Sequence, residues 1–443
     1  MNANAEETSY FPHWRERAEG VIAPDERLPA PQTVALGLQH VVAMFGSTVL
    51  APLLMGFDPN VAILFSGIGT LIFFAVVGGR VPSYLGSSFA FIAVVIAATG
   101  YAGSGANANL GVALSGVIAA GVVYAIIGAI VIVLGYRWID RLMPPVVTGS
   151  IVAVIGLNLA PIAVKGISAR AFDTWIGIAT VVVVGLVAVR APGLARRLPI
   201  LLGGIGGYLL YALCANGLGF GKPIDFSGVA RASWIGWPSF TAPVWSERAI
   251  GLIAPVAVVL VAENLGHIKA VAAMTGRNLD AYLGRAFVGD GLATIVAGSG
   301  GGTGVTTYAE NIGVMAVTKV YSTLLFIVAA LFAIVLGFSP KFGALISTIP
   351  GPVLGGLAIV VFGLITATGG RIWVQNDVDF SRARNLVTAA ATLTFGAGDL
   401  ALKLGGFTLG GIGTATFGAI ILYQLFGDEP ARQTQADRAS KVT

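Results

Sequence analysis

Apolar runs long enough to cross a lipid bilayer recur along nearly the whole chain. Of the 443 residues, 56% are hydrophobic and only 11% are charged, whereas a soluble domain carries about 25% charged residues. A membrane-spanning helix needs about 20 apolar residues. We therefore expect an all-α polytopic membrane protein with fourteen transmembrane segments: 33–54, 60–78, 87–99, 109–135, 145–163, 173–189, 199–217, 249–269, 287–299, 308–318, 321–338, 350–367, 386–398 and 405–425.

Four of these spans, the third, ninth, tenth and thirteenth, are short for a full crossing. The segment VPSYLGSS precedes the third span and GSGGGTGVTT precedes the tenth. Such Gly-, Ser- and Pro-rich stretches favour extended or irregular backbone, which is tolerated at membrane depth only inside protein or beside a cavity. The pattern predicts short extended segments before two broken helices that meet at a substrate site. The alternative is a pair of ordinary loops before short helices.

Three weak sequence matches indicate an internal repeat of seven spans. They pair the first span with the eighth, the third with the tenth and the fifth with the twelfth. The matched segments are LQH (38–40) with AEN (262–264), SSFAF (87–91) with TTYAE (306–310), and PVVTG (145–149) with PVLGG (352–356). Because seven is odd, the second copy must cross the membrane in the opposite direction. This predicts the 7+7 inverted repeat found in secondary transporters.

The basic residues set the expected orientation. With the N-terminus inside, eighteen of the 26 Lys and Arg residues fall on the cytoplasmic side and seven on the outside, which is the bias of the positive-inside rule. Both tails, 1–32 and 427–443, are therefore predicted to be cytoplasmic. The same bias explains the net charge of +5 without a nucleic-acid partner.

The sequence shows no pattern for a metal, a cofactor or a covalent catalyst. Cys214 is the single cysteine, so an intrachain disulfide is excluded. No Cys/His cluster has metal-ligand spacing, and no Walker-type loop is present. The N-terminal residues lack the short apolar segment of a cleaved signal peptide. We therefore expect no cofactor and no enzyme activity.

Few ionisable residues lie inside the predicted spans. They are His40, Glu263, His267 and Glu310, with Asp290 near the start of the ninth span. A carboxylate at membrane depth is costly and usually marks a transport pathway, which favours a functional role for Glu263 and Glu310. Glu263 and His267 are four residues apart, so they share one helix face.

The remaining polar residues have alternative interpretations. His267 could contact the ligand or relay a proton. His40, and Gln39 beside it, are more typical of packing inside a helix bundle. Asp290 could act at the site or cap a helix.

Two aromatic residues, Phe89 and Tyr308, follow the two breaks at matching places and could flank one pocket. Carboxylates accept hydrogen bonds, helix-end N–H groups donate them, and aromatic faces stack. A planar neutral molecule with both N–H and C=O groups suits these partners. Uracil is such a molecule, and this chemistry alone equally allows a purine base.

Several motifs together carry a resemblance to a known family. They are ENIGVMAVTK (310–319), LQH (38–40), YLGSSFAF (84–91) and AENLGH (262–267). Over residues 31–425 the chain resembles the nucleobase–ascorbate transporters, a family of nucleobase:cation symporters. The N-terminal segments FPHW and APDERLP place the resemblance closest to bacterial uracil and pyrimidine permeases.

The resemblance implies two structural domains. A core domain would comprise 33–142 and 249–340, and a gate domain would comprise 143–248 and 341–426 and hold two copies together as a homodimer.

The resemblance also implies the roles of the site residues. Glu263 and Glu310 would hold the base, and His267 would contact it and support proton coupling with Glu263. The backbone at Phe89 and Ala309 would complete the grip, and Tyr308 would stack on the base. The residues expected to support the site are Gln39, His40, Ser47, Asp290, Asn311 and Phe362.

The sequence thus favours proton-coupled import of uracil across a bacterial inner membrane. A xanthine or other purine carrier is the nearest alternative, because Asn264, Ala309 and Phe362 depart from the pattern of uracil carriers and Asp290 matches that of purine carriers. An anion transporter of the same inverted fold is a second alternative, although two carboxylates in the site disfavour anions.

Overall fold

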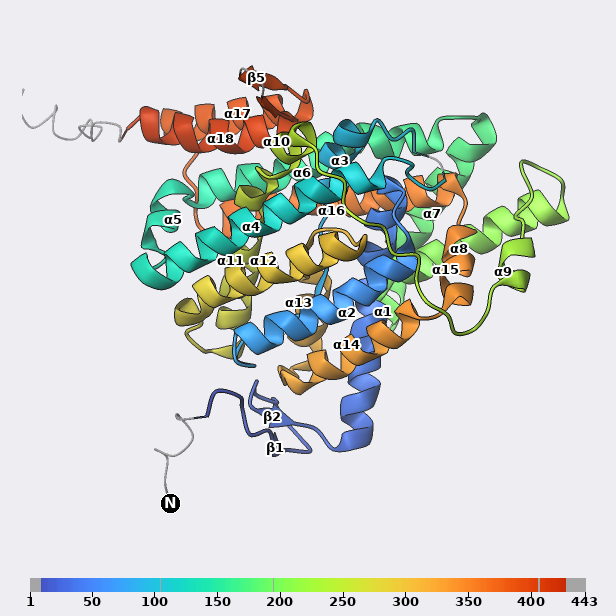
Figure 1. Ribbon diagram of the computed structural model, residues 1–443, viewed down its shortest axis with the longest axis horizontal. Coiled ribbons are helices and arrows are strands. Elements are labelled where there is room, and N and C mark those ends of the chain that lie inside the picture. Colours follow the sequence, from blue (N-terminus) through green and yellow to red (C-terminus); the bar gives the residue numbers. More distant parts are fainter. Residues whose placement is uncertain (1–8, 104, 194, 405–406, 428–443) are drawn as a thin grey trace, which may run out of the picture.

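A computed structural model describes residues 9–103, 105–193, 195–404 and 407–427. The ends of both predicted tails, 1–8 and 428–443, lie outside the described residues. The protein is a bundle of long helices with three short two-stranded pairings (Figure 1). The all-α membrane architecture expected from the sequence is confirmed.

A helix occupies each of the fourteen predicted spans. In the first half these are α1 (Ala30–Met55), α2 (Pro59–Val76), α3 (Phe91–Thr99), α4 (Leu110–Leu134), α6 (Pro145–Ile167), α7 (Ala171–Arg190) and α8 (Pro199–Ala212). In the second half they are α10 (Glu247–Ile253) with α11 (Val256–Thr275), then α12 (Leu283–Gly300), α13 (Ala309–Thr318), α14 (Leu324–Gly337), α16 (Gly351–Gln375), α17 (Ala383–Ala397) and α18 (Gly411–Leu425).

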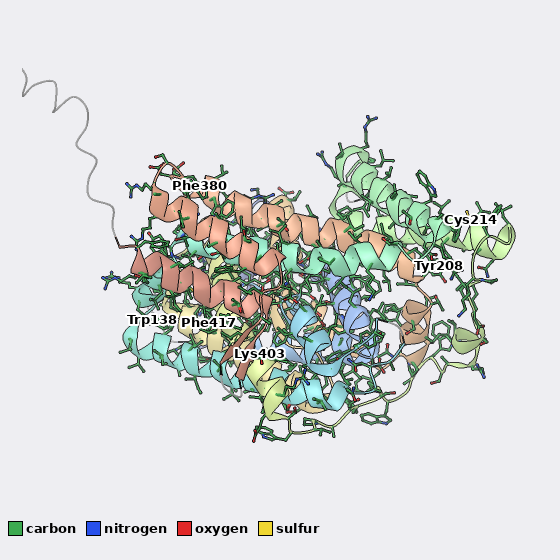
Figure 2. The ribbon with its side chains drawn as sticks, turned by 90° about the horizontal axis from the view of Figure 1, so that it is seen from above. Trp138, Tyr208, Cys214, Phe380, Lys403 and Phe417 are labelled. Carbon is green, nitrogen blue, oxygen red and sulfur yellow. The ribbon has the colours of Figure 1, made fainter. Side chains whose placement is uncertain are left out.

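Short elements connect these helices. They are β1 (Arg15–Glu16), β2 (Glu26–Arg27), β3 (Leu85–Ser87), α5 (Arg137–Leu142), η2 (Ala195–Arg197), η3 (Leu213–Gly217), α9 (Ser227–Arg231), η4 (Asp280–Tyr282), β4 (Val305–Thr307), α15 (Pro340–Ser347), β5 (Leu402–Leu404) and β6 (Phe407–Leu409). Figure 2 shows Tyr208 of α8 and Cys214 of η3 near one end of the molecule and Trp138 of α5 near the other.

Eight helices in the described part are long and apolar enough to cross a membrane alone. The shorter ones include α3 and α13, which follow the breaks predicted from the sequence. The ninth span is longer than predicted: α12 has 18 residues, and hydropathy misses its first part because Arg285 lies there. The eighth span is divided at Pro255, since proline has no N–H for the helical bond. The last helix begins later than predicted because β5 and β6 precede it.

The packing of the helices repeats in mirrored pairs. Helix α2 packs on α14, and the counterpart of α2 in the second half, α12, packs on α4. Likewise, α7 packs on α8, and their counterparts α17 and α18 pack on each other. In the same way α6 packs on α17 as α16 packs on α7. In each case the second contact is obtained from the first by replacing both helices with their counterparts seven spans away. This is the contact pattern of a 7+7 inverted repeat, as the sequence predicts.

Glycines allow the closest of these contacts. A Cβ atom at Gly121 of α4 would lie 2.8 Å from the carbonyl oxygen of Gly291 of α12, and one at Gly291 would lie 2.7 Å from that of Gly121. In the mirrored pair, a Cβ at Gly67 of α2 would lie 2.5 Å from the carbonyl oxygen of Ala330 of α14. Small residues let membrane helices approach until their backbones touch. The figure shows α2, α4, α12 and α14 as neighbouring helices in this part of the bundle (Figure 1).

The two breaks meet at the centre of the repeat. Strands β3 and β4 pair antiparallel, with Gly86 opposite Thr306. The Ser88 N–H donates to the Gly304 carbonyl (2.9 Å), and the Tyr308 N–H donates to the Tyr84 carbonyl (3.0 Å). Two equivalent strands that run in opposite directions must pair antiparallel, so this pairing agrees with an inverted repeat.

The hydrogen-bond pattern also corrects the sequence alignment by one residue. The bonds donated by Ser88 and Tyr308 are equivalent, which gives an offset of 220 rather than the 219 of the sequence match. Phe89 therefore corresponds to Ala309, and Tyr308 corresponds to Ser88. Short stretches rich in Ser, Thr and aromatic residues resemble each other in more than one register. Sequence similarity alone therefore did not determine the correct alignment of the two breaks.

Candidate functional site

The candidate residues lie together around the paired strands β3 and β4, on two helices and in the two breaks. Glu263 and His267 lie on α11, and Glu310 is the second residue of α13. The breaks supply Phe89, just before α3, and Tyr308, just before α13. A break leaves the first N–H groups of the following helix without intrahelical partners. The site therefore offers carboxylate acceptors and backbone donors at one place.

The two carboxylates are held by contacts that mirror each other. The Ser88 hydroxyl, at the start of the third span, donates to Glu263 Oε2 at 3.5 Å. The Ser47 hydroxyl of α1 donates to Glu310 Oε1. The first contact joins span three to span eight. The second joins span ten to span one, and spans ten and one are the counterparts of spans three and eight. The carboxylates themselves are not counterparts in the repeat, because Glu263 is on span eight and Glu310 is on span ten.

Neither carboxylate has a basic partner. Among the described residues, no Lys, Arg or His forms an ion pair with Glu263 or Glu310. The two helices that carry them, α11 and α13, pack against each other. Two acidic groups close together without a cation disfavour a bound anion and favour a ligand that donates hydrogen bonds.

Two backbone donors face no acceptor. In the part of the chain that the structure describes, the N–H groups of Phe89 and Ala309 make no hydrogen bond. The next N–H of the first break, that of Ala90, is bound by the Ser88 hydroxyl at 3.3 Å. Phe89 and Ala309 are equivalent in the repeat, so each half contributes a free donor to the site. These are the two backbone positions that the family resemblance implies for the site.

The aromatic residues take different places. The Phe89 ring packs edge-to-face against Phe362 of α16, with ring centroids 5.9 Å apart. The Tyr308 ring lies against Gly86, where a Cβ atom would be 2.4 Å from the ring. Its hydroxyl donates to the Ser87 carbonyl at 3.0 Å and accepts from Thr48 at 3.0 Å. Tyr308 therefore braces the strand pair, while Phe89 and Phe362 form an aromatic contact between the segment before α3 and α16.

A chain of hydrogen bonds leads from His267 into the protein. His267 Nδ1 bonds the Thr307 hydroxyl at 2.8 Å, and that hydroxyl donates to Asn264 Oδ1 at 3.2 Å. The Asn264 amide in turn donates to the Tyr124 hydroxyl at 2.9 Å and to Asp290. These hydrogen bonds fix the orientation of the His267 ring.

Asp290 lies at the inner end of this chain. It is fully buried, seven residues into α12, so it is not a helix cap. Its second oxygen, Oδ1, has no hydrogen-bond partner among the described residues. Thr307 and Tyr124 were not singled out in the sequence, because a Thr in a break and a Tyr in an apolar run carry no distinguishing pattern.

The remaining predicted residues surround the first span. The Asn311 amide donates to His40 Nδ1 at 3.0 Å and to the His40 carbonyl at 3.1 Å. His40 is buried and also packs on Phe326, with ring centroids 4.8 Å apart. This is the packing role considered for His40. Gln39 Nε2 is buried and has no hydrogen-bond partner among the described residues, so it is a further candidate donor.

The site is accessible from one side. Ala309 is exposed, Glu263 and Glu310 are partly exposed, and a Cβ atom at Gly266 or Gly313 would meet nothing within 4 Å. Gly266 and Gly313 lie further along α11 and α13, toward the end predicted to be cytoplasmic. On the opposite side of Glu263, the residues of α11 are almost all buried. The exposed surface next to the carboxylates therefore lies toward the predicted cytoplasmic face.

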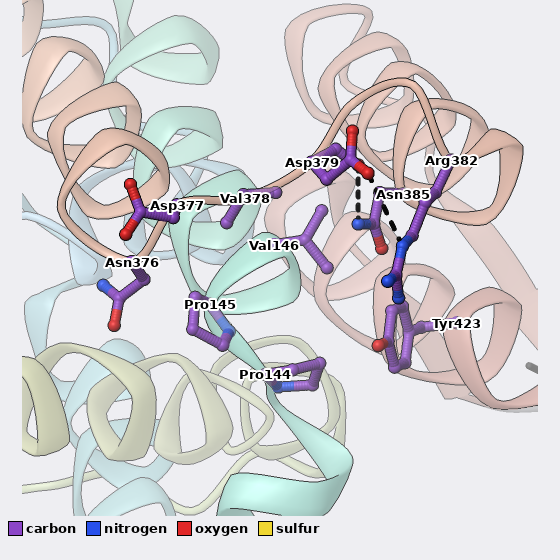
Figure 3. Close-up of a pocket in the computed structure, with 10 residues that line it drawn as sticks. All are labelled: Pro144, Pro145, Val146, Asn376, Asp377, Val378, Asp379, Arg382, Asn385 and Tyr423. Atoms are coloured by element: carbon purple, nitrogen blue, oxygen red, sulfur yellow. Dashed lines mark hydrogen bonds and ion pairs between the residues drawn. The ribbon is translucent and has the colours of Figure 1, made fainter.

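Two other cavities lie away from the carboxylates. A polar cavity of about 250 Å³ is lined by the start of α6, the end of α16 and residues of α17 and α18, with Asp379, Arg382 and Asn385 at its wall (Figure 3). An apolar cavity of about 330 Å³ lies between α1, α8, α15 and α16. Neither is lined by Glu263 or Glu310. No group of three His, Cys, Asp or Glu side chains that could hold a metal occurs within the described residues.

The fold is that of a membrane transporter with an inverted repeat, and its candidate binding site lies at two broken helices. The chain belongs to the nucleobase–ascorbate transporter family, because residues 31–405 match the family described as the permease family. It is 65% identical to the putative pyrimidine permease RutG of Escherichia coli (strain K12) over 94% of this chain and 95% of that one. It is 41% identical to the uracil permease of Paenibacillus larvae subsp. larvae, over 92% of this chain and 96% of that one. The expected family, and a transporter rather than an enzyme, are confirmed.

Solved structures share the fold at low sequence identity. The transmembrane domain of the cyanobacterial bicarbonate transporter BicA matches with a TM-score of 0.62 and 17% identity, over 90% of this chain and 98% of that one. The murine anion transporter Slc26a9, in its inward-facing state, matches with a TM-score of 0.66 and 12% identity, over 90% of this chain and 68% of that one. These likenesses support the 7+7 fold and carry no information on the substrate.

Proposed function

We propose that the protein imports uracil together with protons across a bacterial inner membrane by alternating access. One observation carries this proposal. Two carboxylates without a basic partner, Glu263 and Glu310, lie at the same strand pair as the free N–H groups of Phe89 and Ala309. Two relatives, named as a putative pyrimidine permease and a uracil permease, support the same substrate.

Uracil matches the site group by group. Its two ring N–H groups donate to the carboxylates, and its two carbonyl oxygens accept from the N–H groups of Phe89 and Ala309. The edge-to-face pair of Phe89 and Phe362 forms an apolar wall for the flat ring. Tyr308 holds β3 beneath the base, and Gln39 offers a further donor. Hydrogen bonds to a charged acceptor contribute about 1.5–3 kcal/mol each.

Proton coupling follows from the charge of the site. A charged side chain at membrane depth costs roughly 2.5–3.5 kcal/mol on insertion scales, and neither carboxylate has a cation beside it. A proton on Glu263 removes one of these charges, and His267, one turn along α11, is placed to exchange that proton. Thr307 and Asn264, backed by Asp290, hold His267 in position.

Alternating access requires two bodies that move against each other. We propose that the core domain, 33–142 and 249–340, carries the site past the gate domain, 143–248 and 341–426. We also propose a homodimer formed through the gate domain, which light scattering of the detergent-solubilised protein would measure. Both tails are assigned to the cytoplasm, and a C-terminal reporter that is active only in the cytoplasm would test this.

Two other substrate classes, purine bases and anions, fit the site less well than uracil. Asp290 gave weight to a purine such as xanthine, but its contacts are with Asn264 and Tyr124 rather than with the free donors of the site. The solved relatives named as bicarbonate and anion transporters share only the fold. Glu263 and Glu310 would repel an anion.

Uptake of radiolabelled uracil into proteoliposomes tests the proposal. We expect accumulation above empty liposomes, competition by unlabelled uracil, and weak competition by xanthine and uric acid. This order of competition is expected from the relatives, which are named as a pyrimidine permease and a uracil permease. Strong inhibition by xanthine with weak inhibition by uracil would assign the protein to the purine carriers instead, and uptake of bicarbonate alone would assign it to the anion carriers.

A further inference from the structure

The N-terminal segment 9–28 is packed onto the protein rather than projecting from it as a simple tail. Its strands β1 and β2 pair parallel to each other, and Ile22 forms a parallel bridge with Val320. Figure 1 shows this segment beside the lower ends of α1 and α14. The segment contains the FPHW motif and all but the last residue of the APDERLP motif, to which the proposed transport chemistry assigns no role.

One anchor fixes the end of α13, the short helix that carries Glu310. The Ile22 N–H donates to the Lys319 carbonyl at 3.0 Å, and the Tyr321 N–H donates to the Ile22 carbonyl at 2.8 Å. Ile22 is completely buried in an apolar cluster with Val320 and Leu325. Lys319 has a left-handed φ of 57°, which turns the chain out of α13 and toward Ile22.

A second anchor fixes the end of α11, the helix that carries Glu263 and His267. The helix ends at Gly276, and the next residue, Arg277, forms an ion pair with Asp25. Asp25 is three residues from Ile22. One short segment therefore joins the ends of the two helices that supply the site carboxylates.

The position of α13 depends strongly on such anchors. The helix has ten residues, of which only Asn311, Val314 and Met315 are buried. Its start is held by the pairing of β4 with β3. Helices this short gain little stability from their own hydrogen bonds, so contacts at the two ends fix where Glu310 lies.

We propose that residues 9–28 form a clip that sets the spacing of Glu263 and Glu310 and thereby the affinity for the base. The inference rests on the proposed function. The clip acts through α11 and α13, so its residues are positioning residues. It stays attached while the protein transports, because both of its anchors lie on helices of the same proposed domain.

Charge reversal at the ion pair tests the clip. We expect Asp25→Arg and Arg277→Asp each to raise the KM for uracil about threefold or more, the scale of converting a surface ion pair into a like-charge contact. The maximal rate per inserted protein should change little. The double variant Asp25→Arg with Arg277→Asp restores the pair and should restore the KM. Arg170→Asp is the control, because it makes the same charge reversal at an ion pair outside the clip, that of Arg170 with Asp173, and should leave the KM unchanged.

A disulfide between the clip and α13 gives a second, independent test. Bridge partners lie within the Cα separation of about 4.4–6.8 Å that a disulfide needs. In a Cys214→Ser background, Ile22→Cys with Val320→Cys should crosslink on oxidation, and the crosslinked protein should transport uracil with an unchanged KM.

The outcomes separate the two proposals. Normal KM values in both single charge variants, or loss of transport on crosslinking, would overturn the clip while leaving uracil transport intact. Failure of the unmodified protein to take up uracil would instead reject the proposed function.

Discussion

Replacing Glu310 by Gln is expected to reduce uracil uptake by about 10- to 100-fold. The substitution keeps the size of the side chain and removes a charged acceptor that contributes about 1.5–3 kcal/mol to a hydrogen bond, which corresponds to that range in affinity. It also weakens the bond from Ser47, which holds the carboxylate in place. The measurement is the initial rate of radiolabelled uracil uptake, normalised to the amount of protein in the membrane.

The matched control is Glu247→Gln. Glu247 begins α10 and is exposed, so the same chemical change there should leave uptake near the unmodified rate. Near-normal uptake by a folded Glu310→Gln protein would show that Glu310 does not hold the base. A gain of xanthine uptake in the variant would show that this position selects between the two classes of base.

An inward proton gradient is expected to drive uracil accumulation in proteoliposomes, and a sodium gradient alone is not. The site has two carboxylates without a basic partner, and one turn from Glu263 it has a His, the side chain that most readily exchanges protons near physiological pH. Uptake should rise when the outside is more acidic than the lumen, because protonation then occurs on the side of entry and release on the other.

A protonophore provides the control for this experiment. It should abolish accumulation and leave only slow equilibration of uracil across the membrane. Accumulation that persists with the protonophore and requires sodium would refute proton coupling without affecting the assignment of uracil.

The costliest residues of the site were predictable from the sequence. Glu263, His267 and Glu310 stand out because charged and polar groups in apolar runs are expensive. Pro and Gly patterns indicated the two breaks, and an odd number of spans indicated the inversion. These signals are local or periodic, so a single sequence carries them.

Features that depend on three-dimensional pairing were not predictable. The equivalence of Phe89 with Ala309 follows from hydrogen bonds between β3 and β4, which the sequence similarity placed one residue away. Ser88 and Thr307 are ordinary hydroxyl residues until the fold places them beside Glu263 and His267. The packed N-terminal segment was expected to be a tail, because its apolar residues are few, and the burial of Ile22 depends on Val320 and Leu325, which lie about 300 residues further along the chain.

An experimental structure determined with uracil bound tests the account most directly. We predict one uracil per chain beside the β3–β4 pair, with its N–H groups within hydrogen-bonding distance of Glu263 and Glu310 and its carbonyl oxygens facing the N–H groups of Phe89 and Ala309. Uracil bound in the cavity beside Arg382 or in the crevice between α1 and α8, with Glu263 and Glu310 untouched, would contradict it.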